Sequence, residues 1–281
     1  KAVTFYPFIL MDQLDGNTLV DPWSDTAGQP AFPWRGRITT SLAPGVAGSP
    51  DLSATAAAEV ASFFGTATAA QFSRSGSVIS YSGPAEWSYR RFILHNAMVC
   101  QAAGGVESFC IGSGMRALTQ IRGAGGSFPA VDALVALAAE VRLILGPSCK
   151  LTYAADWSEY FGYHADGNVY FHLDTLWASP NIDFIGIDNY MPMSDWREGE
   201  GHADAAWQTL HNPDYLQANI AGGEGFDWYY ASDVDDAAQT RTPISDGTSD
   251  EPWVYRYKDL RNWWTCQPHP RIAGVRQPTP T

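Results

Sequence analysis

The sequence predicts an α/β fold of the (β/α)₈ barrel type, and three observations lead to it. Several runs are apolar on both faces, which is typical of parallel strands covered by helices. Segments with helical spacing alternate with these runs. No glycine-rich dinucleotide fingerprint follows any of them, which favours a barrel over a doubly wound sheet. The length of 281 residues suits a barrel, which typically needs about 250.

In the N-terminal half, five segments carry structural signals. The apolar run 2–10 predicts a strand, and the polar segment 13–50 is long enough to indicate a functional loop. An Ala-rich helix over 51–70, broken at Gly65, should follow, and then a short strand over 78–81. Ser82-Gly83-Pro84 should open a further helix that ends at Gly104-Gly105.

In the C-terminal half, strands are expected over 106–112, 150–155 and 182–187, separated by a helix over 129–145 and a short one over 173–178. Beyond Tyr190 the pattern loosens. Helices are expected over 213–221 and 226–239, the segment 246–264 is mixed, and the tail 267–281 shows no core pattern.

Composition narrows the classes of function. Hydrophobic residues make up 45% and charged residues 17%, enough for a sizeable core. A net charge of −13 repels phosphate groups, so we expect neither nucleic acid nor an anionic lipid surface as partner. No run of about 18 apolar residues predicts a membrane span. Four cysteines without C-x-x-C spacing and six histidines without H-E-x-x-H imply no metal site.

Polar residues at the ends of the expected strands carry the chemistry. In a parallel barrel the active site lies at the carboxyl ends of the strands. That rule selects Asp12, then Ser113 to Arg116, then Asp156 to Glu159, and then Asp188-Asn189-Tyr190. Three of these ends combine a carboxylate with a nearby aromatic, a pairing that suits carbohydrates, and sugar hydrolysis needs two carboxyl groups.

Each candidate also has a purely structural interpretation. Asp12 and Asp188 could cap turns or pair with Arg35 or Arg116, and Trp157 and Tyr190 could be packing residues. Glu224, in a Gly-rich segment, could be a solvated charge. Ser113 lacks the G-x-S-x-G elbow of serine hydrolases.

Seven strings resemble a known family: PFILMDQLDGN, PWSDTAGQPAFPWRGRIT, WSYRRFILH, FCIGSGMRALTQIRGAG, YAADWSEYFGY, DFIGIDNYMPMSDWR and GGEGFDWYYASD. Together they resemble the TIM-barrel-like domain of gene transfer agent and phage-like tail proteins, over residues 3–276. That domain lies in a baseplate hub protein and is similar to retaining glycoside hydrolases. The resemblance implies a cell-envelope glycan and other baseplate proteins as partners. It implies a place in a particle tail, assembled in the cytoplasm and acting at the recipient envelope, and no cofactor.

The resemblance also implies a register. The segments 2–11, 109–113, 151–155 and 182–187 correspond to barrel strands three to six, so residues 1–281 would hold the central part of one barrel domain, with long loops at 13–50 and 191–281. The chain, which opens without a signal peptide, would be an excerpt of a longer polypeptide. It should show an open sheet without strands one, two, seven and eight.

Two departures from the family bear on activity. The family usually reads Ser-Glu-Met-Arg where this chain has Gly114 in place of the acid/base glutamate. The segment with the nucleophile glutamate, Thr-Glu-Leu-Gly, is absent. The chain is therefore expected to be inactive as given, with Glu159 and Asp188 as fallback carboxylates.

Two hypotheses remain from different classes: a glycoside-hydrolase-like barrel that engages and cleaves an envelope polysaccharide or peptidoglycan glycan, and an inactive structural or glycan-binding baseplate module. The expected sugar-binding residues are Asp12, Trp34, Arg35, Arg116, Asp156, Trp157, Asp188, Asn189 and Tyr190.

Overall fold

The chain forms two compact units, which are described separately. A computed structural model describes residues 2–247 and 249–281. Unit 1 runs from the N-terminus to Asp156 and includes His172–Asp188. Unit 2 comprises Trp157–Phe171 and Asn189–Thr281. The prediction of a single barrel domain over 1–281 is not tested by this division.

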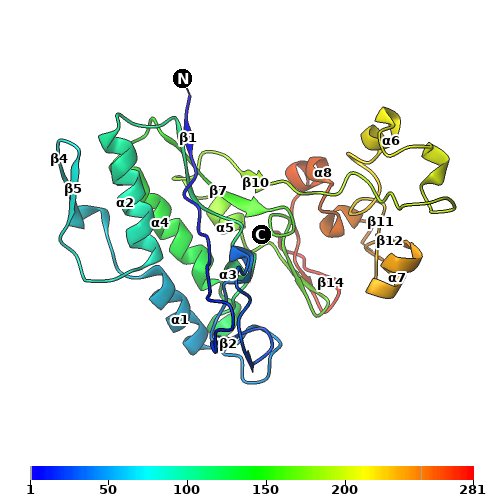
Figure 1. Cartoon of the computed structure of the whole chain (residues 1–281), viewed down its shortest axis with the longest axis horizontal. Helices are drawn as coiled ribbons and strands as arrows, with labels where there is room; N and C mark the ends of the chain where they lie inside the picture. Colours follow the sequence, from blue (N-terminus) through cyan, green and yellow to red (C-terminus); the bar gives the residue numbers. More distant parts are fainter. Residues whose placement is uncertain (1, 248) are drawn as a thin grey trace. The chain divides into compact units, whose positions relative to one another are not determined.

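Unit 1 is built on a four-stranded parallel sheet (Figure 1). Its strands lie in the order β1 (Thr4–Phe5), β6 (Ser108–Ser113), β7 (Lys150–Asp156) and β10 (Gly186–Asp188). This order is the one that the sequence register assigns to barrel strands three to six, and it confirms the α/β class. Among the described residues no further strand pairs with the outer edge of β1 or β10. The absence of the other barrel strands from the chain stays a prediction.

Helices cover one face of this sheet, and α2 (Tyr89–Ala102) and α4 (Pro129–Leu145) pack on β6 side by side (Figure 1). On the sheet itself, the rings of Phe5 and Phe109 are paired in register on β1 and β6 and stack with centroids 5.6 Å apart. The remaining elements of unit 1 are α1 (Ala54–Phe64), α3 (Arg116–Thr119), α5 (Asp174–Trp177), η1 (Arg35–Arg37), η2 (Ala69–Gln71), η3 (Ala124–Gly126), β2 (Val20–Asp21), β3 (Thr26–Ala27), β4 (Phe72–Ser75) and β5 (Val78–Tyr81).

Three expectations for unit 1 need correction. The first strand covers Thr4–Phe5 rather than 2–10, and Pro7, which has no N–H to give to a ladder, follows soon after it. The last strand covers Gly186–Asp188 rather than 182–187. The helix expected to open at 82–84 begins at Tyr89, because the Ser88 hydroxyl accepts the Arg91 amide as its N-cap. By contrast, α4 has the expected bounds.

Unit 2 consists of short elements around a four-stranded sheet in the order β14-β13-β9-β8. The sequence did not predict the hairpin of β8 (Tyr163–Ala165) and β9 (Asn168–Tyr170). The helix expected over 226–239 is wrong for its first half, which holds β11 (Trp228–Tyr229). The other elements of unit 2 are β12 (Thr242–Pro243), β13 (Arg271–Ile272), β14 (Val275–Arg276), α6 (Pro213–Ala218), α7 (Asp233–Ala238), α8 (Leu260–Thr265), η4 (Ala205–Trp207) and η5 (Pro252–Tyr255).

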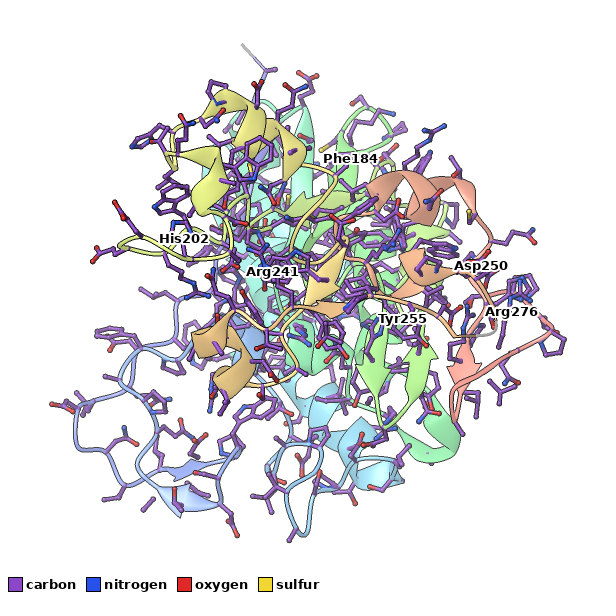
Figure 2. The ribbon with its side chains drawn as sticks, turned by 90° about the vertical axis from the view of Figure 1, so that its right-hand side faces the viewer. Phe184, His202, Arg241, Asp250, Tyr255 and Arg276 are labelled. Carbon is purple, nitrogen blue, oxygen red and sulfur yellow. The ribbon has the colours of Figure 1, made fainter. Side chains whose placement is uncertain are left out.

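The tail contributes to the interior of unit 2, against expectation. The side chain of Arg271 is completely buried and bonds Asp246 and Glu251. Arg276, labelled with Tyr255 in Figure 2, also pairs with Glu251. These ion pairs fix the β13–β14 hairpin. A search of the described helices finds none long and apolar enough to cross a membrane.

Candidate functional site

The carboxyl ends of the parallel strands in unit 1 bring together residues far apart in the sequence. Asp188 at the end of β10 pairs in register with Asp156 at the end of β7. Side chains in register on neighbouring strands point to the same face of a sheet, so both carboxylates lie on one face. Ser113 ends β6 next to them, and Gly114 follows. This is the edge where the sequence predicts a site.

Arg35, from the long loop before α1, connects these strand ends. Its Nε donates to the backbone oxygen of Ser113 at 2.9 Å, and its Nη2 donates to Asp188 Oδ2 at 3.0 Å. The Tyr6 hydroxyl donates to the same carboxylate oxygen at 2.7 Å. The guanidinium also lies over the ring of Phe8, 4.4 Å from its centroid. We call Tyr6, Arg35 and Asp188 the strand-end cluster.

The strand-end cluster is partly accessible to solvent. The side chains of Arg35 and Asp188 are 12% and 19% exposed. Burial, and next the hydrogen bond to Asp188, raise the pKa of Tyr6 to about 12. Tyr6 therefore stays protonated and keeps donating to Asp188 at neutral pH. The carboxylate of Asp188 accepts hydrogen bonds from Tyr6 and Arg35. The pairing with Arg35 is one of the structural roles that the sequence left open for Asp188.

Gly114 adopts a backbone conformation that favours glycine, with φ of +52°. Its amide donates to the Ala154 oxygen at 2.8 Å, which fixes the turn against β7. A Cβ atom at this position would lie 3.0 Å from Arg35 Nη2. Any side chain here, including the glutamate of the family pattern, therefore requires Arg35 to move.

The other candidates in unit 1 lie outside the strand-end cluster. Asp12, Trp34 and Arg116 are exposed, and in the described part of the chain no hydrogen bond or ion pair joins their side chains to it. The ring of Trp34 packs over Gly36, where a Cβ would lie 2.3 Å from the indole. Asp156 is 6% exposed, so it is buried behind the strand end rather than open to solvent.

Four candidates belong to unit 2. Trp157 packs edge-on against Tyr257, with ring centroids 4.6 Å apart. Glu159, a fallback carboxylate, is completely buried. Asn189 accepts the Met191 amide with its side chain and is exposed, as is Tyr190 at 77%. Of these, Tyr190 presents an open ring of the kind that could stack on a sugar.

Glu224 is half-buried in a Gly-rich turn of unit 2, and burial, followed by the charge of Asp195, raises its pKa. The sequence left open that Glu224 is simply a charge in water, and its partial burial argues against that interpretation. Within residues 2–247 and 249–281, no group of three or more His, Cys, Asp and Glu side chains is arranged to hold a metal ion.

Sequence reasoning missed Tyr6 and Tyr153. The Tyr153 hydroxyl accepts the Met115 amide at 3.0 Å, which fixes the turn after Gly114. One sequence signal could have identified Tyr6. It directly precedes Pro7, which cannot donate to a strand ladder, so Tyr6 lies where the first strand must end and is a strand-end residue like the other candidates.

Comparison with known proteins gives one finding. A family model described as the GTA TIM-barrel-like domain, GTA standing for gene transfer agent, matches residues 87–281, more than half of the chain. The matched span includes Gly114, Asp156 and Asp188, whereas Tyr6 and Arg35 lie before it. No curated protein matches the chain.

Proposed function

Because the chain belongs to the family of GTA TIM-barrel-like domains, we propose that it works in a gene transfer agent particle as a module that engages a glycan of the recipient cell envelope. The observation that carries this proposal is the strand-end cluster, which gathers polar side chains from three segments at the carboxyl edge of a parallel sheet. Such edges are where barrel proteins bind their ligands. The glycan would be an envelope polysaccharide or the glycan of peptidoglycan.

The tail of the particle is the place proposed for the module, next to other baseplate proteins. A carboxylate, a guanidinium and a phenol suit hydroxyl-rich ligands, because together they offer both donors and acceptors. An exposed aromatic ring of unit 1 such as Trp34, which is 44% exposed, would stack on a sugar face.

Binding without cleavage is the first form of this proposal. Gly114 has no carboxyl group to protonate a leaving oxygen, and its φ and the nearby Arg35 disfavour a side chain there. Arg35 and Tyr6 both donate to Asp188 Oδ2, and these bonds stabilise the carboxylate and so lower its reactivity as a nucleophile.

Hydrolysis is the second form, and one observation favours it. Asp156 and Asp188 pair in register on neighbouring strands, which lie about 4.8 Å apart in a sheet. Retaining glycosidases hold their two carboxyl groups about 5–5.5 Å apart. Because Asp156 is only 6% exposed, a bound glycan would have to displace Arg35 from Asp188 and also open the strand end before both carboxylates faced it.

A binding measurement tests the first form. The whole chain is titrated with soluble peptidoglycan fragments and with purified envelope polysaccharide of a recipient strain, and binding is followed by calorimetry. We expect saturable binding of one of them that Arg35→Met weakens by about tenfold, since a bound hydroxyl or carboxylate loses a charged donor. Arg261→Met, at an exposed arginine of unit 2, is the matched control. Equal binding by both variants would remove the strand-end cluster from the proposal.

A turnover measurement separates the two forms. Release of reducing ends from the same glycans is followed for the wild-type chain, Asp188→Asn and Gly114→Glu. Binding alone predicts no release from any of them. Release by the wild-type chain that Asp188→Asn abolishes would establish hydrolysis. Release gained only with Gly114→Glu would mark Gly114 as the lost acid position.

A further inference from the structure

Strand β6 contains a β-bulge just before the strand end that belongs to the candidate site. From Cys110 to Ser113 this strand advances three residues, whereas its partner β7 advances only two, from Thr152 to Ala154. One extra residue is therefore accommodated within Ile111–Gly112. A bulge of this kind bends its strand and re-aims the residues that follow it.

The extra residue decides which face of the sheet Ser113 occupies. With the bulge, Ser113 pairs with Ala154, which lies two residues before Asp156 on β7 and so shares its face. In a regular ladder, Ser113 would pair with Ala155 and would point to the opposite face. The bulge therefore puts Ser113 on the face that carries Asp156 and Asp188.

From this position Ser113 acts on two members of the strand-end cluster. Its backbone oxygen accepts the bond from Arg35 Nε at 2.9 Å. Its side chain also influences the pKa of Tyr6, on which a hydrogen bond from Ser113 follows burial and Asp188 as a cause and lowers the value. Ser113 is only 3% exposed, so it serves to place Arg35 and Tyr6 rather than to meet a ligand.

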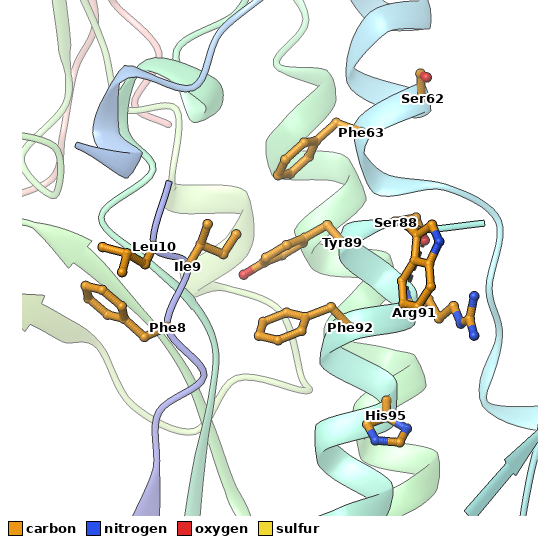
Figure 3. Close-up of a pocket in the computed structure, with 11 residues that line it drawn as sticks. Phe8, Ile9, Leu10, Ser62, Phe63, Ser88, Tyr89, Arg91, Phe92 and His95 are labelled. Atoms are coloured by element: carbon orange, nitrogen blue, oxygen red, sulfur yellow. Dashed lines mark hydrogen bonds between the residues drawn. The ribbon is translucent and has the colours of Figure 1, made fainter. Parts of the chain in front are cut away.

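Tyr89, the first residue of α2, reaches this bulge. Its hydroxyl donates to the backbone oxygen of Ile111 at 2.9 Å, in a buried bond. Gly112 makes room for the hydroxyl, because a Cβ at this position would lie 2.4 Å from Tyr89 Oη. Figure 3 shows the Tyr89 ring extending from α2 between the rings of Phe63 and Phe92. These ring contacts fix the direction of the phenol, and the hydroxyl at its end fixes the bulge.

Ring packing alone does not account for the hydroxyl of Tyr89. A phenylalanine at this position would fill the same space against Phe63, and a buried hydroxyl is costly unless it forms a hydrogen bond. The hydroxyl finds its acceptor in the bulge, where the ladder between β6 and β7 is interrupted and backbone groups need partners from outside it. The tyrosine is therefore matched to the irregular end of the strand.

We propose that Tyr89 is a positioning residue of the strand-end cluster: its hydroxyl holds the bulge of β6, and the bulge aims Ser113 at Arg35 and Tyr6. Tyr89 is 5% exposed, so it acts through the strand and does not touch a ligand. The importance of this role rests on the proposed function, because a glycan at the strand ends would need Arg35 in place.

Tyr89→Phe tests the proposal without a glycan, because it keeps the ring and removes the hydroxyl. Nitrogen-15 NMR of the whole chain follows the Nε–H of Arg35, identified as the signal that Arg35→Met removes. The bond to Ser113 should protect this proton from exchange with water, and Tyr89→Phe should speed its exchange by about fivefold or more. Tyr160→Phe, which removes a buried hydroxyl that donates to the Tyr257 oxygen in unit 2, is the matched control and should leave the signal unchanged.

Glycan binding gives the second readout. Calorimetric titration with the same peptidoglycan fragments and envelope polysaccharide should show binding weakened about fivefold by Tyr89→Phe, in a chain that circular dichroism shows to be folded. In the Arg35→Met background the same change should have little further effect, because both substitutions act through one guanidinium.

The outcomes separate this role from the proposed function. Equal exchange of the Arg35 proton in the wild type and in Tyr89→Phe would overturn the proposal, whatever the glycan result. Lower stability with unchanged affinity and unchanged exchange would also overturn it, since Tyr89 would then serve folding alone. Faster exchange with weaker binding supports it. Faster exchange in a chain that binds neither glycan would support the positioning role and count against the proposed function only.

Discussion

Each unit contains an arginine that forms ion pairs with carboxylate side chains. The two arginines, Arg35 in unit 1 and Arg271 in unit 2, differ in the number of carboxylates they contact and in their exposure to solvent. In unit 2, Arg271 is completely buried and donates to Asp246 at 2.5 Å, to Glu251 at 2.7 Å and to the backbone oxygen of His269 at 2.5 Å. In unit 1, Arg35 donates to Asp188 and to one backbone oxygen, and both side chains keep some contact with solvent.

This difference separates a structural cluster from a candidate site. Nothing outside the protein can reach Arg271, so its ion pairs can contribute only to folding. A ligand can reach Arg35 and Asp188, and it can replace one of their bonds at a modest desolvation cost. The same pair of residue types therefore has two roles, and burial decides which role each takes.

Removing Arg271 should have the largest effect on stability. Arg271→Met leaves Asp246, which is 5% exposed, buried without its ion-pair partner. Breaking a buried ion pair on one side typically costs about 3–5 kcal/mol. We expect a loss of that size in the free energy of unfolding, measured by urea denaturation with far-ultraviolet circular dichroism.

Arg276→Met is the matched control, because Arg276 pairs with the same Glu251 but is 35% exposed. Surface ion pairs contribute about 0–1 kcal/mol, so this variant should lose much less. Equal losses for the two variants would show that burial does not distinguish these arginines, and the contrast between the clusters would fail.

Removing Arg35 should have a smaller effect on stability. Arg35→Met removes hydrogen bonds to a carboxylate and to a backbone oxygen, and bonds to charged groups contribute about 1.5–3 kcal/mol each at most. Because the pair keeps solvent contact, we expect about 1–2 kcal/mol in the same urea experiment. The double variant Arg35→Met with Asp188→Asn should cost less than the sum of the single variants. Strict additivity would contradict a direct interaction.

The sequence predicted the elements in which a local pattern is strong. The bounds of α4 follow from Pro129 at its start, a long helical stripe and Gly146 at its end. The buried strands β6 and β7 follow from continuous apolar runs. In contrast, β8 and β13 are two or three residues long, and their pairing depends on tertiary contacts that no local pattern records.

Only part of the candidate site could be predicted, because local sequence patterns mark single residues but not the tertiary contacts between them. Asp188 and Arg35 could be selected singly, because strand ends and long loops are recognisable in the sequence. Tyr6 lies 182 residues from Asp188, and only the strand order of the folded sheet brings their side chains together. Arg271 was missed because a short Pro-rich tail has no apolar periodicity to mark it as interior.

Replacing Gly114 should cost about 1–2 kcal/mol, the usual cost of the left-handed conformation for a residue with a Cβ. In Gly114→Ala the new methyl group also crowds Arg35, so the variant should weaken glycan binding together with stability. Gly76→Ala is the control, because its φ of +62° lies in the same left-handed region but a Cβ there meets no atom within 4 Å. If both variants lose the same stability and Gly114→Ala leaves glycan binding unchanged, then Arg35 does not constrain position 114.

The smallest expected effect is that of Tyr6→Phe, and it depends on pH. The pKa of Tyr6 is raised from 10.0 to about 12, so its protonated form is favoured in the folded state. For a group whose folded pKa is raised, the stabilisation is fully present below pH 10 and is lost as the pH rises toward 12. Tyr6→Phe should therefore be less stable than the wild type by less than about 1 kcal/mol at pH 7. Because only the wild type loses stability as the pH rises above 10, the difference should disappear and then reverse in sign before pH 12. Urea denaturation at pH 7, 10 and 12 measures this, and titration of tyrosinate absorbance should lose one late-ionising group. If Tyr6→Phe instead became progressively less stable than the wild type as the pH rises, the phenol would not donate to Asp188, and the strand-end cluster would reduce to the single pair of Arg35 and Asp188.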